Sequence, residues 1–207
     1  MARATQADTH ALVWAVASRT YPGESSSGDH SLVKRFGQGV LVAVVDALGH
    51  GRDASPAASQ AVAILDRYAH ESLPVILEQC HKELIGTRGV VMSLASFRPA
   101  EHVMSWLGVG NVDGVLVSSD PTARPQRRTL LTRSGIVGGD LPKLSPSTVP
   151  VVTGDTLIFS TDGVRTGFAG TVTSAESPQE IADRVMATYA KGTDDALVLV
   201  VRYLGDH

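Results

Sequence analysis

Aspartates stand beside strongly apolar stretches at three places in the sequence. Asp46 and Asp162 each follow a run of residues that is typical of a buried strand, and Asp194 closely precedes a third such run. Each place alone is compatible with an ordinary turn, because aspartate and glycine are frequent turn residues. In an antiparallel sheet, however, the end of one strand lies beside the start of its neighbour. We therefore expect the three carboxylates to meet at one edge of a sheet.

Carboxylates gathered in this way predict a metal site. Like charges at short distance repel one another unless cations lie between them. Hard divalent cations such as Mg²⁺ and Mn²⁺ prefer oxygen ligands, and the sequence has no cysteine and histidine cluster with zinc spacing. Asp29 precedes another predicted strand and is a fourth candidate ligand. Asp195 is the residue at which a further metal ion would be sought.

The elements that must position these aspartates are mainly strands. Strand-like runs occur at residues 11–17, 31–36, 40–45, 89–97, 102–109, 112–118, 129–132, 156–160 and 196–203. Helical spacing of apolar residues begins near residue 55 and again at 75–84. A third helix is predicted after Ser177, with Pro178 in its first turn and Glu180 completing a capping box. Strands that follow one another without intervening helices favour an α+β domain of antiparallel sheets with helices outside.

The composition limits the classes of function. The 207 residues are 43% hydrophobic and 19% charged, with a formal net charge of -3. This balance argues against disorder and against a nucleic-acid partner. The polar N-terminus and the lack of a long apolar run predict no export signal and no membrane span. We expect one domain over residues 1–207, in a cytoplasmic monomer without a membrane or nucleic-acid partner.

Two further features have ordinary structural interpretations. Cys80 is the single cysteine, so no internal disulfide can form, and its place in an apolar helical stretch predicts packing instead of nucleophilic chemistry. The arginines at positions 124, 127 and 128 lie beside two prolines, which is typical of a solvated loop.

The aspartate segments resemble motifs of a known family. Residues 46–51 (Asp-Ala-Leu-Gly-His-Gly) are similar to the Asp-Gly-x-Gly-His-Gly motif of the SpoIIE-like branch of the metal-dependent (PPM, type 2C) protein phosphatases. Residues 27–29, 160–164 and 194–198 resemble three other motifs of that branch, in the same order. Together with residues 108–112 and 134–139, they make the chain similar to stand-alone feedback phosphatases of the stressosome.

The resemblance implies a four-layer α-β-β-α sandwich and a catalytic centre with two divalent metal ions, Mn or Mg. Asp46 would bridge the metals, and the backbone carbonyl of Ala47 with a water-linked Asp29 would hold one of them. The other would be held by two further carboxylates, Asp162 and Asp194. Ala47 replaces the family glycine, a change that keeps the carbonyl. His50 is a candidate catalytic residue, although it lies later in its motif than the acid histidine of eukaryotic relatives.

The same resemblance implies substrates and partners. They would be phosphorylated stressosome scaffold proteins of the RsbR and RsbS type, whose dephosphorylation would act as negative feedback on the general stress response. One alternative is a phosphatase of a phosphorylated anti-sigma antagonist, the RsbU type. The others are a pseudophosphatase that binds phosphoproteins without turnover and a hydrolase of small phosphoesters. Arg19 is a candidate for the substrate phosphate, with a surface salt bridge as its alternative.

Overall fold

The computed structural model describes residues 3–9, 11–173 and 175–205, and over these residues the chain forms one six-stranded and one five-stranded antiparallel sheet. Sheet A contains, in spatial order, β1 (Arg3–Thr9), β2 (Leu12–Arg19), β11 (Ala196–Tyr203), β10 (Thr156–Ser160), β7 (Asp113–Val117) and β8 (Arg127–Thr129). Sheet B contains β3 (Asp29–Phe36), β4 (Gly39–Ala47), β5 (Val90–Arg98), β6 (Val103–Val109) and β9 (Ser147–Pro150).

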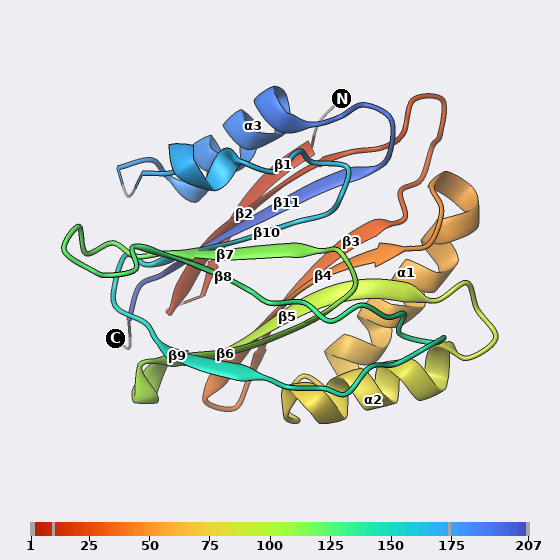
Figure 1. Ribbon diagram of the computed structural model, residues 1–207, viewed down its shortest axis with the longest axis horizontal. Coiled ribbons are helices and arrows are strands. Elements are labelled where there is room, and N and C mark those ends of the chain that lie inside the picture. The colour runs from red at the N-terminus through yellow and green to blue at the C-terminus, as the bar shows by residue number, and fades with distance from the viewer. Residues whose placement is uncertain (1–2, 10, 174, 206–207) are drawn as a thin grey trace.

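The two sheets are stacked, and helices cover their outer faces (Figure 1). The helices α1 (Gly51–Arg67) and α2 (Leu73–Leu84) pack on sheet B, whereas α3 (Pro178–Tyr189) packs on sheet A. Three apolar clusters fill the three interfaces between the layers. The predicted α-β-β-α sandwich is therefore confirmed.

Successive side chains of β4 point to opposite faces of sheet B, and both faces must be covered, which explains the layered fold. Leu41 and Val45 face α1 and α2, whereas Val42 and Val44 face sheet A. All four side chains are fully buried, and burial of each such side chain stabilises the fold by about 1.5–3 kcal/mol. A strand with two apolar faces must be covered on both sides.

The helices begin close to their predicted positions. Ser177 caps α3, and its hydroxyl accepts a hydrogen bond from the Glu180 N–H while the Glu180 carboxylate accepts one from the Ser177 N–H, which confirms the capping box. Helix α1 begins at Gly51, one turn before the predicted start. Helix α2 begins at Leu73 and includes Pro74, because the first turn of a helix tolerates a residue without an N–H.

Other details differ from the sequence-based expectations. The strands β1 and β9 were not predicted, since both are short of apolar residues. Arg127 and Arg128, expected in a solvated loop, begin β8, where they pair with β7. Cys80 is fully buried in α2, and burial raises the pKa of its thiol to about 12, which confirms its packing role. Within the described residues, no helix is long and apolar enough to cross a membrane.

Candidate metal centre

Two of the predicted ligands lie opposite each other in sheet B. The strand β3 begins at Asp29, and β4 carries Asp46 next to its end. The antiparallel register pairs these two residues directly. Side chains opposite each other on neighbouring strands have Cβ atoms roughly 4.5–5.5 Å apart. The strand register therefore brings two carboxylates to one end of sheet B.

The other two ligands come from sheet A, which corrects the expectation that a single sheet edge carries them all. Asp162 follows β10 and Asp194 precedes β11, which pairs with β10. The backbone N–H of Thr161 donates a hydrogen bond of 3.0 Å to the carbonyl of Leu197, so the two segments stay together beyond the strands. The candidate site thus spans the interface between the two sheets at one end of the sandwich.

Thr161 connects the two halves of the site. Its hydroxyl donates a 2.7 Å hydrogen bond to the Oδ2 atom of Asp29 and accepts a 2.9 Å hydrogen bond from the backbone N–H of Leu197. Both interactions are buried. The sequence reasoning assigned no role to Thr161, although its position directly before Asp162 was a usable signal.

Two glycines permit the close approach of the segments. A Cβ atom on Gly28 would lie 2.8 Å from the Cβ atom of Ala54 in α1. A Cβ atom on Gly163 would collide with the backbone carbonyl oxygen of Asp195. Side chains at either position would push apart the loops that carry Asp29 and Asp162.

Burial and neighbouring negative charges raise the pKa values of two of the carboxylates. Burial raises the pKa of Asp29 to about 7, against the opposing effect of its hydroxyl hydrogen bond. Burial likewise raises the pKa of Asp46 to about 8. Neighbouring negative charges add to this second shift, and they belong to Asp29, Asp162, Asp194 and Asp195. Without a cation, Asp29 and Asp46 therefore hold protons at neutral pH, because burial and, to a lesser degree, neighbouring negative charges disfavour their ionised forms.

Asp195 connects three backbone segments around the candidate site. Its side chain is 3% exposed and accepts three backbone hydrogen bonds. The N–H of Tyr21 donates to Oδ1 at 2.7 Å, and the N–H groups of Gly28 and Gly51 donate to Oδ2 at 2.8 and 3.1 Å. This carboxylate fixes the loop before Asp29 and the start of α1 in one arrangement.

His50 and Ala47 occupy different surroundings. His50 precedes α1 with an exposed side chain, and its ring stacks on Tyr21 with 4.4 Å between the ring centroids. The structure therefore places His50 on the protein surface just before α1, where it packs against an aromatic ring. Ala47 is fully buried, and its backbone N–H donates to the carbonyl of Gly28 at 3.1 Å.

Asn111 contacts one of the carboxylates, whereas Arg19 lies on a strand of sheet A next to β11. The amide of Asn111 donates a 2.8 Å hydrogen bond to the Oδ2 atom of Asp162. It belongs to the 108–112 segment noted in the sequence, but it had been given no role. Arg19 ends β2 opposite Ala196 and is exposed. Within the described part of the chain, it forms none of the surface salt bridges that were its alternative explanation.

The donors fit a hard divalent cation. The residues brought together offer carboxylate oxygens and no soft ligand, and their mutual repulsion is the kind that a cation relieves. Among the described residues, no three Asp, Glu, His or Cys side chains are already arranged as a finished metal-binding group. Cations at such a site activate water for attack on phosphate esters.

The sequence matches a known family over most of its length. The model of the family described as Stage II sporulation protein E (SpoIIE) covers residues 37–204. The chain is also 26% identical over 175 residues to phosphoserine phosphatase RsbX of Bacillus subtilis (strain 168), covering 84% of this chain and 85% of that protein.

Solved structures show the same fold. A crystal structure of RsbX in complex with magnesium matches with a TM-score of 0.87 and 22% identity, over 97% of this chain and all of that one (100%). A chain from a study of the bacterial stressosome as a modular system for secondary messenger signalling matches with a TM-score of 0.84. It is 29% identical, over 92% of this chain and 99% of that chain.

Proposed function

The chain belongs to the SpoIIE family of protein phosphatases, and on this basis we propose that it is a divalent-metal-dependent serine/threonine phosphatase of stressosome scaffold proteins. The observation that supports the metal-dependent chemistry is the proximity of aspartates from both sheets, since the charges of Asp162 and Asp194 act on Asp29 and Asp46. Asp29 lies opposite Asp46, and the hydroxyl of Thr161 joins Asp29 to the segment that carries Asp162.

The proposed centre holds two ions, Mn²⁺ or Mg²⁺. Asp46 lies opposite Asp29 and is also affected by the charges of Asp162 and Asp194 from the other sheet. On this basis it would hold both ions. Asp29, through water, and the carbonyl of Ala47 are assigned to one ion, and Asp162 with Asp194 to the other. The ions would supply a reactive water at neutral pH and would neutralise charge on the phosphate.

The residues around the ions would keep the carboxylates in place. Thr161 and Asn111 hold one oxygen each of Asp29 and Asp162, so the remaining oxygens stay free for an ion. Asp195 fixes the loops on either side. Because hydrogen-bond partners of metal ligands commonly change metal affinity by roughly 10–100-fold, these contacts belong to the proposed mechanism.

The proposed substrates are phosphoserine and phosphothreonine of scaffold proteins of the RsbR and RsbS type. Similarity to the phosphoserine phosphatase RsbX supports this assignment, as does the 29% identity to a chain from a stressosome structure. Removal of these phosphates would act as negative feedback on the general stress response.

The test follows phosphate release from phosphorylated RsbS-like and RsbR-like proteins with Mn²⁺, with Mg²⁺ and with EDTA. Metal-dependent release that Asp46→Asn and Asp194→Asn abolish is the expected result. Release from p-nitrophenyl phosphate alone would overturn the substrate assignment, and preference for a phosphorylated anti-sigma antagonist would favour the RsbU type. Scaffold binding without release at any metal concentration would identify a pseudophosphatase.

A further inference from the structure

The sandwich is open along one side, where β8 and β9 are the outermost strands of the two sheets. Between them lies a groove of about 490 Å³, which we call the edge groove. Buried Trp106 and Val149 line it, together with Leu131, whose side chain is 87% exposed. Each flanking strand pairs on one side only, so the groove is bordered by two unpaired strand edges.

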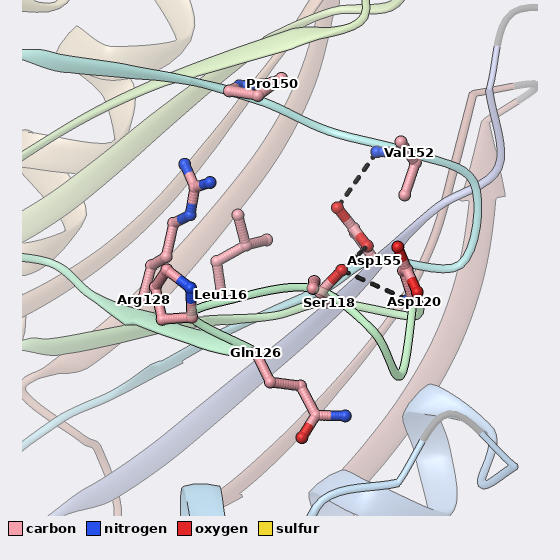
Figure 2. Close-up of a pocket in the computed structure, with 10 residues that line it drawn as sticks. Leu116, Ser118, Asp120, Gln126, Arg128, Pro150, Val152 and Asp155 are labelled. Atoms are coloured by element: carbon pink, nitrogen blue, oxygen red, sulfur yellow. Dashed lines mark hydrogen bonds between the residues drawn. The ribbon is translucent and has the colours of Figure 1, made fainter.

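The edge groove carries positive charge in a protein of net charge -3. Arg128 and Arg133 line it, and no carboxylate does. Over residues 3–9, 11–173 and 175–205, neither guanidinium forms a salt bridge or donates a hydrogen bond to a protein acceptor. Figure 2 shows the guanidinium of Arg128 pointing away from the hydrogen-bonded pair of Asp155 and Ser118 in the adjoining hollow.

Arg127, which directly precedes Arg128, differs from it in having a protein hydrogen-bond partner. It lies on the same strand, but its guanidinium donates a 2.8 Å hydrogen bond to the carbonyl of Ala169. Successive residues of a strand point to opposite faces. The strand therefore directs one arginine toward a protein partner and the next into the edge groove.

One end of the edge groove adjoins the metal centre. The backbone carbonyl of Arg133 accepts a 2.8 Å hydrogen bond from the N–H of Gly110. The next residue, Asn111, donates to Asp162. A peptide segment bound in the edge groove would thus end close to the segment that carries Asn111, the hydrogen-bond partner of Asp162.

We propose that the edge groove binds an extended acidic segment of the phosphoprotein substrate, adjacent to the phosphorylated residue. Arginine pairs with carboxylates through two parallel hydrogen bonds, and an unpaired strand edge can accept an extended segment. Exposed Leu131 offers apolar contact in the same groove. This inference rests on the proposed function, because it locates the substrate chain relative to the metal centre.

Binding is measured first, independently of turnover. A fluorescent peptide with a central serine and flanking glutamates is compared with the same peptide carrying glutamines, by anisotropy with the full chain. The parent should bind the glutamate peptide more tightly, and salt should weaken this preference. The double variant Arg128→Glu/Arg133→Glu should reduce affinity for it roughly tenfold, or about 1.4 kcal/mol. Arg127→Glu, which reverses a single charge on the other face of the strand, should retain the preference.

Turnover is then measured with the phosphorylated forms of both peptides and with p-nitrophenyl phosphate. The double variant should lose kcat/KM for the glutamate phosphopeptide and keep parent activity on p-nitrophenyl phosphate. If reversal of charge lowers the Tm, Arg128→Gln/Arg133→Gln replaces it in both measurements. Equal binding of the two peptides by the parent, or an unchanged preference in the variant, would overturn the proposal. Absence of phosphate release from every substrate would instead count against the proposed function, while the binding comparison would still decide the role of the groove.

Discussion

Replacement of Asp195 by asparagine should weaken metal binding although Asp195 is not a proposed ligand. The carboxylate accepts hydrogen bonds from three backbone N–H groups, of Tyr21, Gly28 and Gly51. An amide has one acceptor oxygen, so its NH₂ group must face at least one of these donors. A buried donor without an acceptor costs about 1–3 kcal/mol. For a chain of this length, the Tm should fall by roughly 2–12 °C.

The loss should extend to the metal centre because the released loops carry its ligands. Gly28 precedes Asp29, and Gly51 follows the short turn after β4, the strand that carries Asp46. Loss of a hydrogen-bond partner near metal ligands typically reduces affinity roughly 10–100-fold. Titration calorimetry with Mn²⁺ should show a decrease of this size for Asp195→Asn.

Asp155→Asn is the matched control. Asp155 is 5% exposed and accepts backbone hydrogen bonds from Ser119 and Val152, at 2.8 and 3.1 Å. It lies at the opposite end of β10 from Asp162. Its replacement should lower the Tm and leave Mn²⁺ affinity unchanged. The reasoning would be refuted if Asp195→Asn bound Mn²⁺ as tightly as the parent, or if both variants lost affinity equally.

Three further predictions concern the same end of the sandwich. The raised pKa values of Asp29 and Asp46, about 7 and about 8, lie above the roughly 3.9 of an unfolded aspartate. The folded metal-free protein therefore binds more protons than the unfolded chain. Its Tm should fall as the pH rises from about 4 to about 8, and Mn²⁺ should suppress that fall in thermal scans. Gly163→Ala should cost about 1–3 kcal/mol in urea unfolding because its Cβ meets a backbone carbonyl, whereas Gly170→Ala, in open space, should change stability by less than about 0.5 kcal/mol. Thr161→Val should destabilise the fold by about 1–3 kcal/mol and lower phosphate release, because two buried hydrogen bonds are lost, and Thr161→Ser should restore both; equal values for valine and serine would contradict this role.

Strand positions near the site were predictable from local patterns. β10 and β11 have the predicted bounds, and β4 extends the predicted run by one residue at its start and two at its end. Their apolar residues determine a buried strand without reference to distant partners. The strand β1 gave no such signal: its residues, Arg-Ala-Thr-Gln-Ala-Asp-Thr, lack alternation, and its pairing with β2 is a backbone interaction.

The assembly of the site was less predictable. Local pattern identifies which strand an aspartate adjoins, but not which of two sheets the strand joins. The sequence therefore indicated one shared edge, whereas Asp46 and Asp162 belong to different sheets. The role of Asp195 could not be predicted for a related reason. Its partners are backbone groups 144 to 174 residues away, and every residue type except proline has a backbone N–H, so the sequence does not indicate which ones it binds.

The most direct test of the account is a titration of the metal-free protein with Mn²⁺, in which bound manganese and phosphate release from a phosphoserine substrate are followed together. The account predicts that two ions bind, that release rises as they bind, and that Asp46→Asn loses both. Release that persists in EDTA, or that Asp46→Asn retains without bound manganese, would contradict it.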